Sequence, residues 1–285
     1  NKMHHALEKD IFKDQNGLDA AHARALALGN KNQIEEIESD EYYFAFADAG
    51  LIAGGEDEVN ADLDALDAVT QAIQEENRSL SETQQLHTEN EKKIATLVER
   101  AVAYGVSDLS WYGEAIHMQP TSQFDDIKRK VDGFIEIAQE KQESDFLGLA
   151  IDVTYSGLYG EQFKFKFFDL LHSIRKGWKS KIKYARDHTG APMKEFSVPK
   201  IILSFDIADV KVLAYMVQHI DDPNVMEKFK NSPMKFAVLN QVLIQCELLA
   251  RFAMESGNDV HFEYSKIVAT MKVLIAKHPK LQAAL

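Results

Sequence analysis

The sequence has one cysteine, few prolines and no long apolar run, and each shortage excludes a class of protein. Cys246 is the only cysteine among 285 residues, so an internal disulfide and a thiolate metal cluster are excluded. Six prolines and 14 glycines exclude collagen-like and low-complexity chains. No apolar run reaches the roughly 18 residues that a membrane span needs. We therefore expect a folded, cytoplasmic protein that has no membrane contact.

The residue patterns of several large functional classes are missing as well. The sequence has no GxGxxG, GxxxxGK[ST], GxSxG or HExxH pattern and no EF-hand loop. These patterns serve dinucleotide binding, phosphate-loop enzymes, α/β-hydrolases, zinc peptidases and calcium sensors. None of these functions has support from the sequence.

Acidic and basic residues are distributed unevenly along the chain. The formal net charge of −13 disfavours general binding to phosphates. Residues 1–67 alone carry −11, whereas residues 164–186 carry +7. We interpret the basic segment either as the solvated face of a domain or as a surface for nucleic acid. Its expected contacts are Lys164, Lys166, Arg175, Lys176, Lys179 and Arg186.

Hydrophobic spacing divides the chain near residue 120. Before this point apolar residues such as Val59, Leu63 and Leu66 follow helical spacing, which predicts an acidic all-helical region over residues 1–120. Ser79 and Glu82 suggest a capping box, so either one long helix or a helical hairpin fits. Residues 109–118 are expected to be a connection. A protein partner, or a second copy of the chain, is expected to bind this region.

Residues 121–285 predict an α/β domain. The expected order is a helix over 122–143, a buried strand over 146–155, a helix ending at 177, strands over 181–185 and 198–205, and long C-terminal helices. The fold class is therefore mainly α with a small mixed α/β layer of about three strands.

One acidic residue lies inside an apolar strand pattern. Asp152 interrupts the run FLGLAIDVTY, and a buried carboxylate is costly unless a partner compensates it. Carboxylates that hold Mg²⁺ beside a lysine are what metal-assisted phosphodiester cleavage uses. Lys181 and Lys183, in the next short strand, are the candidate lysines. Glu161 or Glu136 would supply a second carboxylate.

Residues 136–184 resemble the PD-(D/E)xK restriction-endonuclease-like nuclease superfamily. In that family a helix glutamate precedes a strand aspartate, and a neighbouring strand carries (E/Q)xK. Glu136 and Asp152 match the first two elements, but Lys181 stands where the third element has its carboxylate, and Glu161 would replace it. The resemblance implies a magnesium-dependent nuclease or phosphodiesterase, with Asp152 and Glu161 as metal ligands. Its catalytic residues would be Asp152, Glu161, Lys183, Lys181 and Glu136.

A second interpretation needs no chemistry. The acidic composition of residues 1–67 is also typical of a helical interaction or assembly protein that binds a basic partner. In that case the strands around Asp152 are only a scaffold, and its carboxylate caps a neighbouring helix or pairs with a core lysine or tyrosine. The sequence leaves the enzyme and the interaction protein open.

Overall fold

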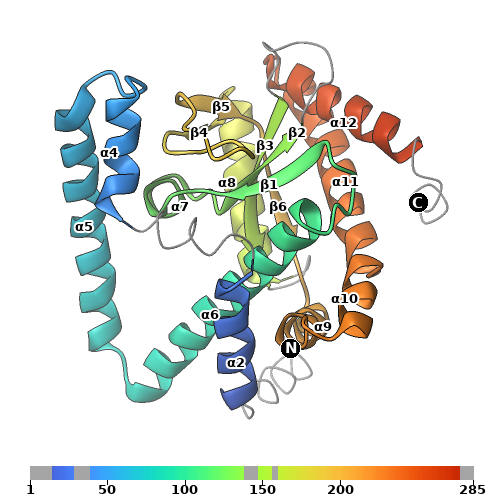
Figure 1. Cartoon of the computed structure of the whole chain (residues 1–285). Helices are drawn as coiled ribbons and strands as arrows, with labels where there is room; N and C mark the ends of the chain where they lie inside the picture. The colour runs from blue at the N-terminus through green and yellow to red at the C-terminus, as the bar shows by residue number, and fades with distance from the viewer. Residues whose placement is uncertain (1–14, 29–38, 138–146, 156–159, 277–285) are drawn as a thin grey trace.

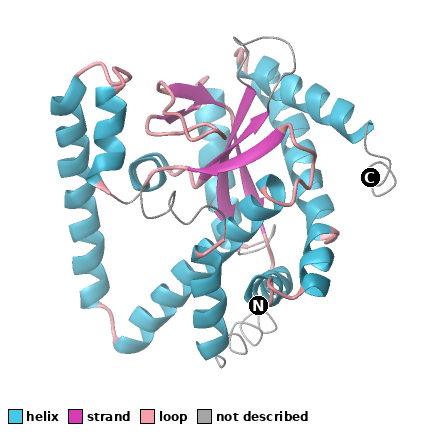
Figure 2. Cartoon of the chain, in the orientation of Figure 1, coloured by secondary structure: helices cyan, strands magenta, loops and turns pink. Residues whose placement is uncertain are grey.

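The computed structural model describes residues 15–28, 39–137, 147–155 and 160–276, and it is mainly helical around a small mixed sheet (Figures 1 and 2). The predicted fold class is confirmed. The helices are α2 (Gln15–Leu26), α4 (Asp40–Asp48), α5 (Gly55–Ser79), α6 (Glu82–Ser107), α7 (Gln123–Arg129), α8 (Glu161–Arg175), α9 (Ile207–Gln218), α10 (Pro223–Lys230), α11 (Met234–Glu255) and α12 (Val260–Ala276). The strands are β1 (Ile116–Pro120), β2 (Gly133–Ile137), β3 (Leu147–Thr154), β4 (Ser180–Ile182), β5 (Phe196–Val198) and β6 (Lys200–Ser204).

Helices α5 and α6 meet in a sharp bend and then diverge, so the chain forms neither one long helix nor a packed helical hairpin here (Figure 1). Leu80 is extended and ends α5. The capping box that starts α6 is formed by Ser81 and Gln84, not by Ser79 and Glu82 as predicted. The backbone N–H of Ser81 donates to Oε1 of Gln84 at 3.0 Å. Helix α4 lies against α5 on one side of the molecule (Figure 1).

The main sheet has the strand order β1-β2-β3-β6. Neighbours among β1, β2 and β3 are antiparallel, whereas β6 is parallel to β3 and is reached through α8. Strand β1, which ends at Pro120, pairs with β2, which begins at Gly133. The main sheet therefore contains residues from both sides of the division that hydrophobic spacing placed near residue 120. A separate two-stranded sheet contains β4 and β5.

The sequence prediction missed strands β1 and β2. Residues 109–118 were expected to be a connection, but β1 begins at Ile116. One helix was expected over 122–143, of which residues 138–143 lie outside the described part of the chain. The helix instead ends at Arg129, because Lys130 adopts a left-handed conformation with φ 55°. Strand β2 follows directly, and all five of its residues are buried. Apolar residues at positions 124, 127, 131, 134 and 135 satisfy helical spacing. A short strand that is buried on both faces shows no alternation of apolar and polar residues, so the pattern did not indicate a strand.

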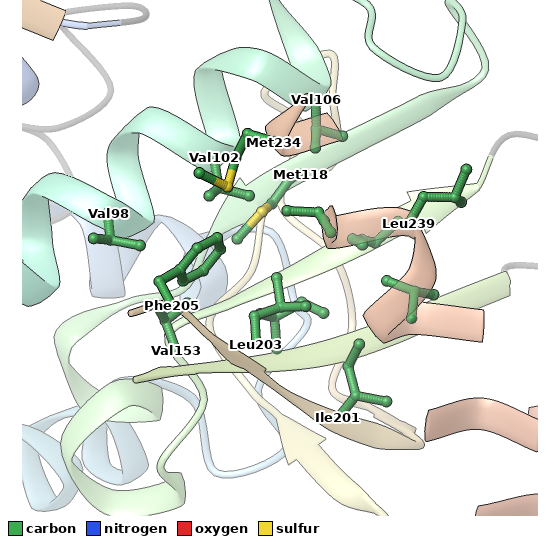
Figure 3. Packing of buried hydrophobic residues seen from close by; sticks show 14 of the residues in the cluster. Val98, Val102, Val106, Met118, Val153, Ile201, Leu203, Phe205, Met234 and Leu239 are labelled. Carbon is green, nitrogen blue, oxygen red and sulfur yellow. The ribbon is translucent and has the colours of Figure 1, made fainter. Parts of the chain in front are cut away.

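Helices cover both faces of the main sheet. On one face Val102 of α6 and Leu239 of α11 pack against Val153 and Leu203 (Figure 3). Side chains of adjacent strand residues point to opposite faces, so Asp152 lies on the other face. There α8 and the small sheet pack, and Ala150 contacts the cluster that includes residues of β4 and β5. The acid that interrupts β3 therefore faces α8.

The outer edge of β6 is closed by glutamine side chains from α11. Gln245 accepts the N–H of Ile202 at 3.1 Å and donates to its carbonyl at 2.6 Å. Gln241 makes the same two bonds with Ser204, at 2.8 and 2.9 Å. These amides replace the strand that a sheet edge would otherwise recruit. The spacing of four residues places both amides on one face of α11.

The helix end predicted at residue 177 is confirmed, and local chemistry also sets the start of α9. Asp206 caps α9 by accepting the N–H groups of Ala208 and Asp209. Gly177 ends α8 with φ 71°, and Cys246 is fully buried. By length and composition, Pro223–Glu255 is apolar enough to cross a membrane, which is weak evidence because core helices pass the same test. Within it, α11 packs on β6 and α12.

Candidate functional site

Asp152 is the centre of a charged cluster at the end of β3. Its carboxylate is 3% exposed and binds two lysines. Lys166 on α8 donates to Oδ1, and also to the carbonyl of Val153 at 3.0 Å. Lys200 at the start of β6 donates to Oδ2 at 2.9 Å. The buried acid that the sequence revealed is therefore compensated by two cations.

Three further carboxyl groups interact electrostatically with Asp152. They are Glu99 on α6, Asp126 on α7 and Asp132 directly before β2. Asp132 also accepts the backbone N–H of Val153 at 2.6 Å, which fixes it beside Asp152. The pairing of β2 with β3 brings the beginning of one strand to the end of the other. We call Glu99, Asp126, Asp132 and Asp152 the acidic cluster.

Burial and mutual repulsion raise the pKa values of three carboxyl groups in the acidic cluster. Burial, followed by the charge of Asp126, raises the pKa of Glu99 to about 7. Burial and the charges of Glu99, Asp152 and Asp126 raise the pKa of Asp132 well above its ordinary value. Burial also raises the pKa of Asp126. Such shifts are typical of functional sites, because a buried group of like charges favours protons or a cation.

Lys166 remains a cation in this cluster. Burial acts to lower its pKa, but the charge and hydrogen bond of Asp152, with the charges of Asp132 and Glu99, outweigh burial and raise it. Its side chain as a whole is 36% exposed, while its ammonium donates to Asp152 and to the carbonyl of Val153. Lys166 can therefore stabilise negative charge but is a poor base at neutral pH.

A cleft of about 390 Å³ opens beside the acidic cluster. Glu99, Asp126 and Asp132 line it, together with Arg100 and His22. Asp152 is not among the lining residues, and it reaches the cluster through its charge and through Lys166. The cleft thus exposes three of the four carboxyl groups to a small ligand or to a phosphate group.

The structure separates the predicted lysines from Asp152. Lys183 binds Glu58 and Asp62 on α5, the latter at 2.5 Å. Its backbone N–H donates to Asp125 at 3.0 Å. Lys181 is exposed and lies 3.5 Å from Glu195. Lys183 therefore joins the N-terminal helices to the rest of the chain, and Lys166 provides the ammonium beside Asp152.

The predicted second carboxylates are also elsewhere. Glu136 lies in β2 rather than on a helix, opposite Gly148, which is four residues or about 13 Å from Asp152 along β3. It binds the ring of His188 at 3.1 Å. Glu161 is 93% exposed and pairs with Lys164 at 3.1 Å. Glu99 and Asp132 are the carboxyl groups that the fold brings to Asp152 instead.

Most of the predicted nucleic-acid contacts lie on α8 or directly after it. Lys164, Arg175, Lys176 and Lys179 are exposed. Lys179 pairs with Glu263 at 2.7 Å. Arg186 instead packs over the ring of Tyr42, at 5.1 Å from its centre.

Sequence reasoning missed the other half of this cluster. Lys200 lies within the apolar run VPKIILSF, as Asp152 lies within FLGLAIDVTY. Two opposite charges in neighbouring buried segments are each a candidate partner for the other. This signal was present in the sequence. Glu99 had no such signal, because a glutamate on an amphipathic helix ordinarily faces water.

In the described part of the chain, no group of three or more histidine, cysteine, aspartate or glutamate side chains is arranged to hold a metal ion. Mg²⁺ is commonly bound by one or two carboxylates, with water and substrate phosphate as the remaining ligands. The oxygen donors of the acidic cluster fit that smaller requirement. Comparison of the chain with protein-family models, curated proteins and solved structures finds no match.

Proposed function

We propose that this chain is a metal-dependent phosphodiesterase that cleaves nucleic acid. The acidic cluster around the Lys166 ammonium, beside an open cleft, is the observation that supports this function. In this proposal, other residues take the places of the PD-(D/E)xK elements. Glu99 would be the helix glutamate, Asp132 the aspartate directly before the first strand, Asp152 the carboxylate of the second strand, and Lys166 the lysine, displaced onto the following helix.

Different side chains of the site would bind the metal, contact the phosphate and accept the proton. Asp126 and Asp132, which line the cleft, would hold Mg²⁺, which when bound stabilises charge on a phosphate group. Lys166, held as an ammonium by Asp152, would contact a phosphate oxygen and stabilise the charge that develops there. Glu99 has a pKa of about 7 and can take a proton from an attacking water at neutral pH. These roles need no contribution from Lys183, Lys181, Glu161 or Glu136.

The test is a cleavage assay on single- and double-stranded DNA and RNA, with Mg²⁺, Mn²⁺ or EDTA. Wild type should cleave only with metal. Glu99→Gln should lower the rate at least 100-fold while retaining its fold, because it removes a strained charge. Asp132→Asn should lose activity as well, and Glu161→Gln is the exposed control that should keep it. Cleavage that persists in Glu99→Gln and Asp132→Asn would overturn the assignment of the site.

A second candidate function rests on the surface of α5. Six exposed carboxylates occur along this helix, whose only basic residue is Arg78. They are Glu56, Asp57, Asp64, Asp67, Glu75 and Glu76. Such a surface favours a basic protein partner and supports the non-enzymatic alternative, an interaction or assembly protein.

Binding of a lysine-rich peptide, measured by calorimetry, tests this alternative. Binding should weaken with salt and in the variant Asp64→Asn/Asp67→Asn. No cleavage of any substrate by wild type, together with tight and salt-sensitive peptide binding, would favour the interaction protein. Sedimentation of the chain alone detects self-association through the same region.

A further inference from the structure

Three large aromatic side chains are exposed on and directly after α8. Phe165 is 66% exposed, Phe168 is 69% exposed and Trp178 is 59% exposed. Single exposed apolar residues are ordinary on protein surfaces, but a group of large rings marks a binding surface. We call these three residues the aromatic face.

The fold directs the aromatic face outward. Leu170 and Ile174 are the buried residues of α8 and attach it to the core. Phe165 and Phe168, one turn apart, are therefore free to contact a ligand. Gly177, with φ 71°, turns the chain so that Trp178 follows the helix end. The Lys176 ammonium lies 4.4 Å from the centre of the Trp178 ring.

Cations accompany the rings. Lys164 lies beside Phe165, and Lys176 contacts Trp178. The pair of Lys164 with Glu161 is exposed on both sides, and such pairs contribute little and exchange readily. From residue 165 to residue 176 the chain extends about 16 Å, the length of a few nucleotides. Rings and cations therefore occur at both ends of α8, with the exposed acid Asp169 between them.

The candidate site begins on the same helix. Lys166 is adjacent to Phe165 in the sequence, yet it points inward to Asp152 while Phe165 points to solvent. The aromatic face and the Lys166 ammonium therefore lie on different sides of α8.

We propose that the aromatic face binds unpaired bases of single-stranded nucleic acid. This inference rests on the proposed function and specifies its substrate. Exposed rings stack on bases of any sequence, and lysines beside them contact the phosphates. In a duplex the bases are stacked on one another and cannot lie on Phe165 or Phe168. A lipid surface would also contact exposed rings, and vesicle binding in the test distinguishes the two.

The experiment is fluorescence anisotropy in EDTA, where cleavage is absent, with a labelled 20-nucleotide strand and its duplex. Wild type should bind the single strand at least tenfold more tightly than the duplex. Phe165→Leu/Phe168→Leu should lose at least tenfold in affinity, because leucine keeps the apolar volume without the ring. Phe165→Tyr/Phe168→Tyr should bind as wild type does. Ile244→Ala/Leu248→Ala removes exposed apolar residues of α11 and is the control.

The outcomes separate this inference from the proposed function. Ring-dependent binding without cleavage in Mg²⁺ supports the aromatic face and removes the nuclease. Cleavage that does not change in Phe165→Leu/Phe168→Leu supports the nuclease and overturns the aromatic face. Equal affinity for strand and duplex, ring-dependent binding to phosphatidylserine vesicles alone, or ring-dependent dimerisation in sedimentation would also overturn it.

Discussion

The ammonium of Lys166 on α8 binds the carboxylate of Asp152 on β3, 14 residues earlier in the chain. Lys200 completes the cluster from β6, at 2.9 Å from the second carboxylate oxygen. The parallel pair β3–β6 and the helix between them are thus joined by one buried acid. This arrangement gives Asp152 a structural role and holds the Lys166 ammonium at the proposed site.

Removal of the Lys166 charge should affect stability as well as activity. Lys166→Met leaves the buried carboxylate with one cation, and we expect the free energy of unfolding to fall by about 1–3 kcal/mol. Urea denaturation measures the change. Lys164→Met, two residues away on the exposed side of α8, should change stability by less than about 0.5 kcal/mol. Equal effects of the two variants would show that the Asp152 ion pair contributes nothing to folding.

Stability without metal should decrease as the pH rises toward neutrality. Because the folded protein raises the pKa of Glu99 to about 7, the folded state holds a proton that the unfolded chain releases near pH 4.5. The stability from that proton is present below pH 4.5 and is lost as the pH rises through about 7. In EDTA, Glu99→Gln should be more stable than wild type at pH 8, and the difference should disappear near pH 4.5. Parallel unfolding curves across this range would contradict the raised pKa.

Lys183 should control the attachment of helices α4 and α5. Its side chain is 6% exposed and binds both Glu58 and Asp62. Lys183→Met should weaken the attachment by about 1–3 kcal/mol, and limited proteolysis near Leu80 should become faster. Lys181→Met is the exposed control and should be cleaved at the wild-type rate. Nuclease activity should survive Lys183→Met, in contrast to the expectation from the sequence.

The same attachment should depend on acid. The hydrogen bond from Lys183 lowers the pKa of Glu58, so its contribution is present above the ordinary glutamate pKa and is lost as the pH falls through the lowered value. Proteolysis near Leu80 with an acid-active protease should therefore accelerate in wild type at low pH. The rate for Lys183→Met should change less.

Gln245 should protect the sheet edge. Gln245→Met leaves the N–H and the carbonyl of Ile202 without their side-chain partner, at a cost of about 2–4 kcal/mol. An unpaired edge strand also recruits other chains, so light scattering should show aggregation on mild heating. Gln71→Met on the exposed surface of α5 makes the same chemical change and should be neutral. Wild-type stability of Gln245→Met would contradict the role of the amide.

The sequence by itself determined the helices with long amphipathic patterns, the buried strand around Asp152, the cap at Asp206 and the stop at Gly177. Each of these is fixed by local spacing or by backbone chemistry, such as the φ 71° that glycine adopts easily. It also showed that Asp152 requires compensation, because a charge inside an apolar strand is costly wherever the strand lies.

Only the tertiary structure decided which residues compensate Asp152. Strand β2 was hidden because a five-residue buried segment has no period of its own and lies beside a true helix. Glu99, Asp132 and Lys166 come from three separate elements, and their convergence depends on strand register and helix packing. Lys183 had the right residue type and directly follows β4, but β4 belongs to the separate small sheet and the acids of α5 hold the Lys183 ammonium. Charge and spacing in one chain predict that a buried acid needs a partner, whereas only packing selects the partner.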